Sequence, residues 1–385
     1  MSKTQAPTNL IMQVEASLNA RFYERRDVIH GLFLGLVSRQ HVVLLGPPGA
    51  AKTALAEAFA KVVGLSYWST LLTRFSTPEE LFGPLSLKAL EQDAYRRIGD
   101  GRLPEAEVAL IDEVFKGNSA ILNTMLPVMN ERVWFNDGQR LPLPLQLMIG
   151  ASNEMPESEE LNALWDRFAL RFVVDYIQDP DSWDQWMTEM ADPIHNGGQL
   201  IPMLDKNTII QLQRAADQVD ARPVIPTFRQ LKNALAQTGI VLSDRRWAVA
   251  IRLVQAEAAI HGRTQATADD VRVVTATLWD QPDQRVDVGK LVLGIIAPHE
   301  IEALTIQDEM REMLRVVAEA PDNEKLKKAQ EVSVDLKHLH TRTLLLIDQA
   351  RKSGYTVSAM EELAKTIKER QLNILRDVLQ IGGAI

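Results

Sequence analysis

The segment GPPGAAKT at residues 46–53 joins a glycine-rich turn to a lysine and a hydroxyl side chain. In loops of the pattern G-x-x-x-x-G-K-[ST], successive backbone N–H groups at a helix N-terminus converge on phosphate groups. The lysine reaches the terminal phosphates, and the hydroxyl binds magnesium. We therefore predict that this segment binds a nucleotide and its Mg²⁺ ion. The predicted contact residues are Gly46, Pro47, Pro48, Gly49, Ala50, Ala51, Lys52, Thr53 and Ala54.

Ala51 stands where the pattern has its second glycine. Glycine matters at a position that needs a positive φ or a close approach of the backbone. This position also lies at the mouth of the following helix, where alanine is the next smallest residue and a better helix former. We expect the alanine to be tolerated and the nucleotide site to be intact. The alternative is an ordinary Gly/Pro turn between a strand and a helix.

A second segment, VALIDEV at residues 108–114, ends an apolar run with two adjacent carboxylates. Adjacent acids at the end of a buried strand are costly unless a cation and a water molecule need them. We predict that Asp112 orients the magnesium ion through water, with Thr53 as the second metal-site residue, and that Glu113 polarises the attacking water. The alternative is a surface strand that ends in acids, which the phosphate loop upstream disfavours.

Polar residues also stand at the ends of the later apolar runs. Asn153, in GASNE, ends the next run, where its side chain could hold the attacking water or the γ-phosphate at the carboxyl edge of a sheet. An ordinary turn is the alternative for this asparagine. The segment LWDRFALRF carries Arg167 and Arg171 before the last strand, and Arg245 and Arg246 begin a later helix in the second domain. Salt bridges are the simple alternative for each arginine.

The segments that must position these residues alternate between two hydrophobic patterns, that of a buried strand and that of a helix. Apolar runs of strand length are separated by segments with helical spacing, which predicts an α/β fold with a parallel sheet and helices on both faces. Pro84 to Pro104 and Glu131 to Pro144 interrupt this alternation and are predicted to be inserted hairpins, the second with a turn at Asn136-Asp137-Gly138. The predicted strands are 41–46, 107–112, 145–152 and 171–176.

Strand patterns end before the last half of the chain, and the domain prediction follows this change. Residues 1–200 are predicted to form the α/β nucleotide-binding core, and residues 201–285 an α-helical domain. The polar stretch 281–289 is expected to be a linker. Residues 286–385 are predicted to be a C-terminal helical region, a long helical hairpin across a turn at Ser353-Gly354.

Composition, charge and apolar runs make several classes of function less favourable, although a local basic patch stays open as an alternative. The formal net charge of −9 provides no overall positive field for nucleic acid or anionic lipid. The apolar runs are far shorter than the roughly 20 residues of a membrane-spanning helix. The chain has no cysteine, which excludes disulfides and thiolate metal sites, and its N-terminus lacks the order of a signal peptide. We expect a cytoplasmic protein with protein partners.

The motifs together resemble those of a known family. GPPGAAKT, VALIDEV, GASNE, DRF and SDRR, in this order and spacing, resemble the MoxR group of AAA+ ATPases. TRFSTPEELFGPLS, GRLPEAE and ILNTMLPVMNER are similar to its RavA branch, and the resemblance covers roughly residues 8–280. It implies an AAA+ core with an α-helical lid domain, a homo-oligomeric ring that is commonly a hexamer, and ATP bound between subunits. Alanine at the position of Ala51 is common in this family.

The resemblance also implies roles for individual residues. Lys52 and Thr53 match the Walker A pair, and Asp112 and Glu113 the Walker B pair. The two predicted inserts correspond to the helix-2 insert near the ring pore and to the hairpin before sensor 1. Three further matches are Asn153 to sensor 1, Arg167 to the arginine finger and Arg245 to sensor 2.

The predicted function is therefore hydrolysis of ATP to ADP and phosphate, used to remodel or mature other proteins. The resemblance implies a von Willebrand factor A adaptor and a protein client as partners. An alternative is a nucleic-acid motor that would use Arg96, Arg97 and Arg102 in the first insert, although neighbouring acids dilute their charge. A third reading, a nucleotide-gated scaffold with negligible turnover, is disfavoured by Glu113.

Overall fold

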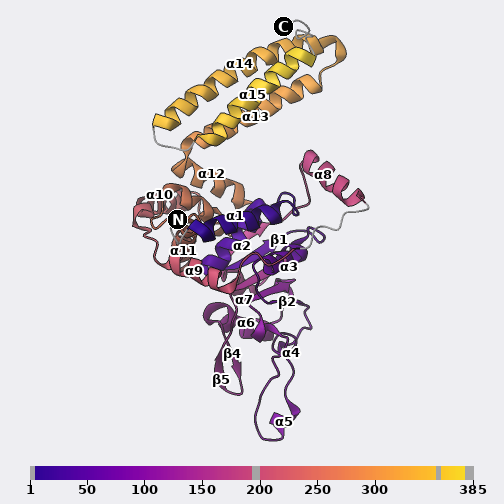
Figure 1. The fold of residues 1–385 in the computed structure, drawn as a ribbon, viewed down its shortest axis with the longest axis vertical. Helices are drawn as coiled ribbons and strands as arrows, with labels where there is room; N and C mark the ends of the chain where they lie inside the picture. The colour runs from indigo at the N-terminus through magenta and orange to yellow at the C-terminus, as the bar shows by residue number, and fades with distance from the viewer. Residues whose placement is uncertain (1–4, 193–199, 353–356, 378–385) are drawn as a thin grey trace. The chain divides into compact units, whose positions relative to one another are not determined.

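The computed structural model describes residues 5–192, 200–352 and 357–377 (Figure 1). The chain divides into two compact units. The first comprises Met1–Pro226 and Gly239–Arg285, and the second Thr227–Thr238 and Val286–Ile385. All of the chemistry-bearing motifs lie in the first unit.

A five-stranded parallel sheet forms the centre of the first unit, with strand order β2-β3-β6-β1-β7. The strands at its middle read as continuous apolar runs, such as HVVLL in β1, because they are buried on both faces. Since β3, β6 and β1 are neighbours, the residues that follow them meet at one edge of the sheet. The strands are β1 (His41–Leu45), β2 (Tyr67–Leu71), β3 (Val108–Asp112), β6 (Leu147–Ser152) and β7 (Phe168–Val173).

The α/β fold is confirmed, with two local differences from the predicted strands. The last strand, β7, begins at Phe168 rather than at Arg171. The edge strand β2 was not predicted, because YWSTL is short and is exposed or half-buried along its length. An edge strand with one neighbour needs no continuous apolar run.

Helices cover the sheet and complete the first unit (Figure 1). Its longer helices are α1 (Gln5–Asn19), α2 (Arg26–Ser38), α3 (Lys52–Val62), α6 (Ser119–Glu131), α7 (Glu159–Trp165), α8 (Pro180–Ala191), α9 (Lys206–Asp217) and α11 (Asp244–Ile260). The short segments are α4 (Pro78–Phe82), α5 (Leu87–Leu90) and the 3₁₀ helices η1 (Leu103–Glu105), η2 (Val114–Lys116), η3 (Arg222–Val224) and η4 (Ala268–Thr277).

The two inserted segments differ from each other. Residues 131–144 form the predicted hairpin of β4 (Val133–Asn136) and β5 (Gln139–Pro142). Residues 84–104 are not a strand hairpin: they contain α5 and one isolated antiparallel bridge, Leu85 to Arg97. The hairpin turn binds this first insert, since Asn136 Oδ1 accepts the Arg97 N–H at 2.7 Å and Asp137 Oδ1 accepts the Tyr95 N–H at 2.8 Å.

The second unit is helical. It contains most or all of α10 (Ile225–Gln237), α12 (Gln284–Ile296), α13 (Pro298–Ala318), α14 (Asp322–Lys352) and α15 (Ser358–Asp377). α13, α14 and α15 share one apolar core that includes Ile306, Leu336, Leu339 and Ile367. The predicted hairpin therefore pairs α14 with α15, and α13 adds a third helix.

Two other expectations concern this region. The predicted polar linker at 281–289 is wrong from residue 284 onward, because α12 begins at Gln284. Gln284 Oε1 accepts the Asp280 N–H at 2.9 Å and the Gln281 N–H at 3.1 Å, which ties the start of this helix to the turn before it. The predicted turn at Ser353-Gly354 lies outside the described residues. No helix in the described ranges is both long and apolar enough to cross a membrane.

Candidate functional site

The phosphate loop connects the end of β1 to the start of α3. Only glycine fits at position 46, because a Cβ atom there would lie 2.0 Å from the Val174 carbonyl oxygen. Gly49 has φ +81°, which favours glycine. Ala51 has φ 62° and ψ 22°, so the alanine adopts the left-handed conformation. The loop therefore keeps a glycine-like backbone at a cost of roughly 1–2 kcal/mol for the alanine Cβ.

Lys52 folds its ammonium group back over this loop. Nζ donates to the Gly46 carbonyl at 2.6 Å and to the Pro47 carbonyl at 2.9 Å. Burial lowers the pKa of Lys52, and the nearby carboxylates of Asp112 and Glu113 oppose this shift. Its charge is held at the mouth of the loop by carbonyls, which a bound phosphate group would replace as the partner.

The hydroxyl of Thr53 meets the acid that ends β3. Thr53 Oγ1 donates to Asp112 Oδ2 at 3.2 Å, although the two residues come from different elements. A hydroxyl and a carboxylate are hard oxygen ligands that suit Mg²⁺, which usually takes one or two carboxylates and completes its shell with phosphate oxygens and water. In the part of the chain that the structure describes, no group of three or more His, Cys, Asp or Glu could hold a metal by itself. The residues present thus fit a magnesium ion that arrives with a nucleotide.

Glu113 and Asn153 meet at the same edge of the sheet. With its amide oriented to donate, Asn153 Nδ2 lies 2.8 Å from Glu113 Oε2 and 3.0 Å from Oε1. Glu113 has φ 51°, an uncommon conformation for a residue other than glycine and one that often marks functional positions. Lys116 Nζ lies 3.2 Å from Glu113 Oε2. The carboxylate is therefore held beside the loop by an amide and an ammonium group.

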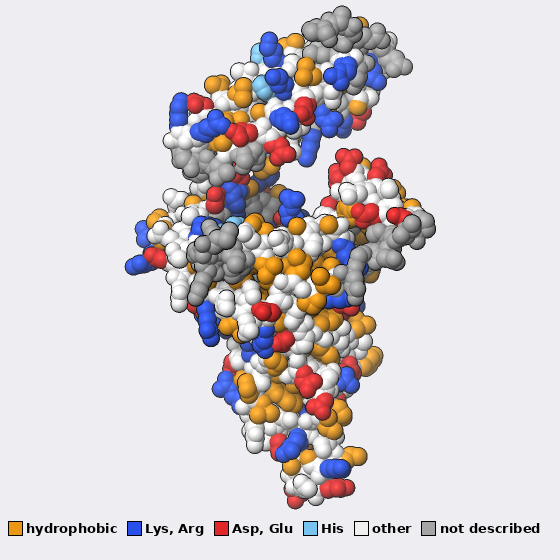
Figure 2. Space-filling view, viewed as in Figure 1, with side chains coloured by type: hydrophobic (Ala, Val, Ile, Leu, Met, Phe, Trp, Pro, Cys, Tyr) orange, Lys and Arg blue, Asp and Glu red, His pale blue; other side chains and the backbone are white. Residues whose placement is uncertain are grey.

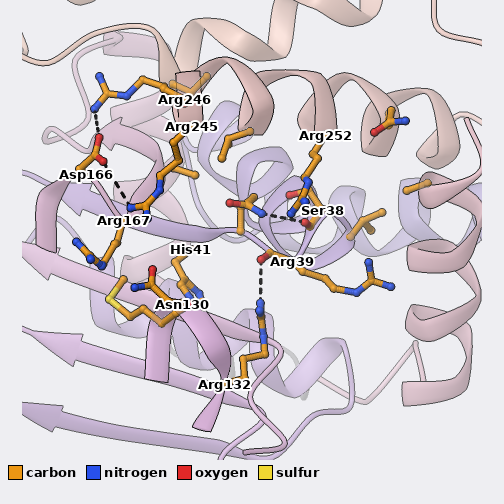
Figure 3. A pocket seen from close by; sticks show the side chains of 18 of the residues that line it. Ser38, Arg39, His41, Asn130, Arg132, Asp166, Arg167, Arg245, Arg246 and Arg252 are labelled. Carbon is orange, nitrogen blue, oxygen red and sulfur yellow. Dashed lines mark hydrogen bonds and ion pairs between the residues drawn. The ribbon is translucent and has the colours of Figure 1, made fainter. Parts of the chain in front are cut away.

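Arg167 and Arg245 lie together at the opposite edge of the sheet. Both line a cavity of about 660 Å³ that also includes His41, the first residue of β1 (Figure 3). Arg167 directly precedes β7, which is parallel to β1. Since the phosphate loop follows the carboxyl end of β1, the predicted finger stands at the far edge from the loop of its own chain. Arg245 is half-exposed, and its ion pair is with Asp166 at 3.8 Å.

Two polar atoms in the wall of this cavity have no partner within the described chain. Arg167 Nε and Thr277 Oγ1 are buried and make no hydrogen bond. Burial and repulsion from Arg245 lower the pKa of Arg167, and Asp166 opposes the shift. Buried polar groups are normally hydrogen-bonded, so these two atoms are exceptions to that rule in the cavity wall.

Sequence reasoning missed three further arginines of the cavity. Arg39 follows α2, Arg132 follows α6, and Arg252 belongs to α11. Arg39 and Arg132 both adopt the left-handed conformation as helix C-caps, with φ 57° and 52°. The signal that could have found Arg39 is its place two residues before β1, at the same edge of the sheet as Arg167.

For Arg171 and Arg246 the salt-bridge alternative holds. Both are buried, and both donate to Asp280 Oδ1, at 2.9 Å and 2.6 Å. Arg246 Nη2 also donates to Asp166 Oδ1 at 2.9 Å. Their guanidinium groups are already engaged and are not available to a phosphate.

Comparison with known proteins extends this picture. A family model described as the MoxR domain in the MoxR-vWA-beta-propeller ternary systems matches residues 9–191, and a model of the AAA lid domain matches residues 223–292. Two uncharacterised proteins of Methanocaldococcus jannaschii are similar over most of their length. One is 36% identical over 284 residues, 74% of this chain and 73% of its own, and the other 34% over 287 residues, 74% of this chain and 76% of its own.

The chain is also similar to a named chaperone and to a solved structure. The chaperone MoxR1 of Mycobacterium tuberculosis is 28% identical over 154 residues, which cover 39% of this chain and 40% of that protein. A solved structure from Cytophaga hutchinsonii has the same fold, with a TM-score of 0.61 at 19% identity over 76% of this chain and 95% of that one. The similarity to the RavA branch stays a prediction. The matched domains, the relatives and the fold agree, and the chain belongs to the MoxR family of AAA+ ATPases.

Proposed function

We propose that this chain hydrolyses ATP to ADP and phosphate at sites that are each completed by two neighbouring copies in a ring, most simply a hexamer. One observation carries the proposal. The phosphate loop, Asp112, Glu113 and Asn153 gather at the carboxyl edge of the sheet, whereas Arg167 and Arg245 line a cavity at the amino edge. This separation supports a site that two copies complete together.

Each half has a defined task. The loop and Lys52 bind the phosphates, Thr53 and Asp112 hold Mg²⁺, and Glu113 orients and polarises the attacking water with Asn153 beside it. The metal neutralises charge on the phosphates when it is bound. Arg167, with Arg245 next to it, stabilises the charge that develops on the γ-phosphate of the neighbouring copy.

Hydrolysis is proposed to drive remodelling of other proteins. The matched family model concerns MoxR domains that occur with von Willebrand factor A and β-propeller proteins, and one relative is named a chaperone. We therefore propose a von Willebrand factor A adaptor and a protein client as partners. Because ATP is a cytoplasmic metabolite, the proposal places the activity in the cytoplasm.

The charges of the two inserts favour a protein client over nucleic acid. Arg97 Nη1 lies 2.8 Å from Glu79 Oε1, and Arg96 lies 3.8 Å from Asp137. Basic and acidic side chains are interspersed at the end of the molecule that carries the inserts, and no continuous basic stripe covers it in this view (Figure 2). A nucleic-acid groove would need unpaired basic groups along its course.

Affinity capture with the Glu113→Gln variant tests the proposal. This variant should bind ATP without hydrolysing it, and so hold its partners, whereas Lys52→Ala should bind no nucleotide and serves as the matched control. We expect a von Willebrand factor A protein and a client to copurify with Glu113→Gln in ATP only. Nucleic acid in place of protein would contradict the remodelling role, and normal turnover by Glu113→Gln would contradict the assigned base.

A further inference from the structure

Asp166 stands directly before Arg167, and its carboxylate contacts both arginines at the start of α11. Oδ1 accepts from Arg246 Nη2 at 2.9 Å, and Oδ2 lies 3.8 Å from Arg245 Nη1. Figure 3 shows Asp166 between these two arginines, with Arg167 close by. The Asp166 carboxylate therefore links the end of α7 to the first turn of α11, which contains Arg245.

Arg246 extends the link to a second carboxylate. Its Nη1 donates to Asp280 Oδ1 at 2.6 Å, and the same oxygen accepts from Arg171 Nη1 at 2.9 Å. Arg171 belongs to β7, the strand that follows the finger, and it also donates to the carbonyls of Phe168 and Trp165. We call the set Asp166, Arg246, Asp280 and Arg171 the finger clamp.

Aromatic packing holds the same region from its other side. The Arg171 guanidinium lies over the ring of Trp165, 4.3 Å from Cζ to the centroid. Trp165 also packs against Trp279 at 5.9 Å and against Phe115 at 5.8 Å between ring centroids. Contacts therefore hold the residues on both sides of Arg167, and a shift of the finger backbone would disturb them.

Arg171 and Asp280 both stay ionised at neutral pH. Burial and repulsion from Arg246 lower the pKa of Arg171 to about 10, and Asp280 opposes the shift. Burial acts to raise the pKa of Asp280, but the guanidinium groups of Arg246 and Arg171 outweigh it and hold this pKa below its ordinary value. Two cations thus face two carboxylates, and no member is left as an unpaired buried charge.

We propose that the finger clamp is a positioning network, which fixes Arg167 and Arg245 in the geometry that meets the nucleotide of the neighbouring copy. The inference rests on the proposed function. It links residues matched by the lid domain, Arg246 and Asp280, to the finger of the same chain. The clamp residues do not touch the nucleotide, and they act through Arg167 and Arg245. A loosened clamp slows hydrolysis at the neighbouring copy and leaves the phosphate loop of its own chain intact.

Arg246→Lys is the test variant, because lysine keeps the charge but lacks the planar fork that spans Asp166 and Asp280. We expect kcat to fall roughly 10- to 100-fold, the order expected for a displacement of about 1 Å, with the KM for ATP little changed. Mixing this variant with Lys52→Ala should restore activity above that of either alone. In mixed rings an intact loop of the Arg246→Lys chain meets an intact clamp and finger of the Lys52→Ala chain.

Three controls separate the explanations. Arg263→Lys removes another arginine fork of the lid, which pairs with Asp270, and should leave kcat unchanged. The triple variant Arg167→Ala/Arg245→Ala/Arg246→Lys should be no slower than Arg167→Ala/Arg245→Ala, because the clamp acts through these two arginines. If Arg246→Lys fails to form rings, Asp166→Asn, which keeps the side-chain shape, is carried through the same assays.

The outcomes distinguish the clamp from the proposed function. If Arg167→Ala hydrolyses ATP normally, the shared site itself is wrong. If Arg167→Ala is slow and is rescued by Lys52→Ala but Arg246→Lys is not rescued, Arg246 serves the nucleotide of its own chain and the clamp is overturned. A kcat loss in Arg263→Lys equal to that in Arg246→Lys would also overturn it, because the effect would then be one of general lid stability.

Discussion

Asn153 places its amide 2.8 Å from Glu113 Oε2, at the carboxyl edge of the sheet and beside the phosphate loop. The contact joins the ends of β6 and β3, which are adjacent strands. By donating to the Glu113 carboxylate, the amide can set the direction in which this carboxylate faces a water molecule at the γ-phosphate. In the proposed mechanism, the orientation of the Glu113 carboxylate therefore depends on this asparagine.

Asn153→Ala is expected to lower kcat by roughly 10²-fold, which is within the range for a displaced general base, and to leave ATP affinity nearly unchanged. Binding is unaffected because the loop and Lys52 are untouched. The measurement is steady-state hydrolysis together with nucleotide binding. The matched control is Asn118→Ala, which removes a cap that accepts the Ala120 and Ile121 N–H groups and should reduce stability by about 1 kcal/mol without slowing turnover. Equal turnover in the two variants would remove Asn153 from the mechanism.

Ala51→Gly is expected to change ATP affinity by less than about tenfold, or 1.4 kcal/mol. The loop backbone already has a conformation that glycine adopts, at φ 62°, so the substitution should not move the groups that bind the phosphates. In folding stability, glycine relieves the strain of the left-handed conformation, and the greater entropy of the unfolded chain offsets much of that gain. Ala51→Val is the contrasting variant, because a β-branched side chain fits this conformation poorly and should weaken nucleotide binding. Calorimetric titration of both variants checks the prediction, and a larger loss in the glycine variant would show that the alanine methyl makes a binding contact.

His30 should stabilise the fold most strongly below neutral pH. Its Nδ1 and Nε2 each lie 2.8 Å from a carboxylate, Glu15 of α1 and Glu257 of α11. Burial lowers the pKa of His30, but the two carboxylates outweigh this and raise it to about 10 from its ordinary 6.5. The folded state thus binds the extra proton, and the contribution is complete below pH 6.5 and is lost as the pH rises through about 10.

The melting temperature of the wild-type chain and of His30→Gln, followed from pH 6 to about 10.5, tests this sign. The difference between the two should shrink as the pH rises. A constant difference would mean that the histidine is held as a neutral ring.

His41 should behave in the opposite way. Its Nε2–H donates to the Met129 carbonyl at 3.0 Å, and its Nδ1 accepts the Met148 N–H at 3.1 Å, so the neutral ring satisfies both contacts. Burial and repulsion from Arg132 lower its pKa to about 3. The unfolded chain binds the proton more readily, so this contribution is present above pH 6.5 and is lost as the pH falls toward 3.

Melting curves between pH 7 and about 4 should show an acid loss of stability that is smaller in His41→Gln than in the wild-type chain. Histidine NMR would report the same neutral ring directly. A ring that titrates near its ordinary pKa of 6.5 would contradict the buried, doubly bonded state.

The order of apolar runs and the phosphate loop was enough to predict the parallel sheet and the edge where the nucleotide residues meet. Carboxyl ends of parallel strands share an edge whatever the loops between them do, so Asp112, Glu113 and Asn153 could be grouped from sequence. The strand β2 could not be found in this way, since an edge strand needs little apolar character. The first insert was also misjudged, because a single bridge leaves no alternating pattern.

The arginines show where sequence reasoning ends. Arg167 and Arg171 are four residues apart, and Arg245 and Arg246 are adjacent, but Arg171 and Arg246 are buried and paired with Asp280, whereas Arg167 and Arg245 are not. That difference depends on packing across β7, α11 and the end of η4, which no local pattern records. Arg39 and Arg132 were missed for a related reason, since a left-handed helix C-cap is usually occupied by glycine and arginine gives no such signal.

The central claim, that each nucleotide site is shared between two copies, is tested most directly by mixing Arg167→Ala chains with Lys52→Ala chains. Each variant alone lacks one half of every site and should hydrolyse ATP slowly, by roughly 10³-fold or more for loss of an arginine finger. Mixed rings contain interfaces that join an intact loop from one chain to an intact arginine from the other. We predict that ATPase activity rises to a maximum near equal mixing, with Arg167→Ala alone still binding ATP normally. A flat activity curve across all ratios, in samples where mixed rings are shown to form, would contradict the account.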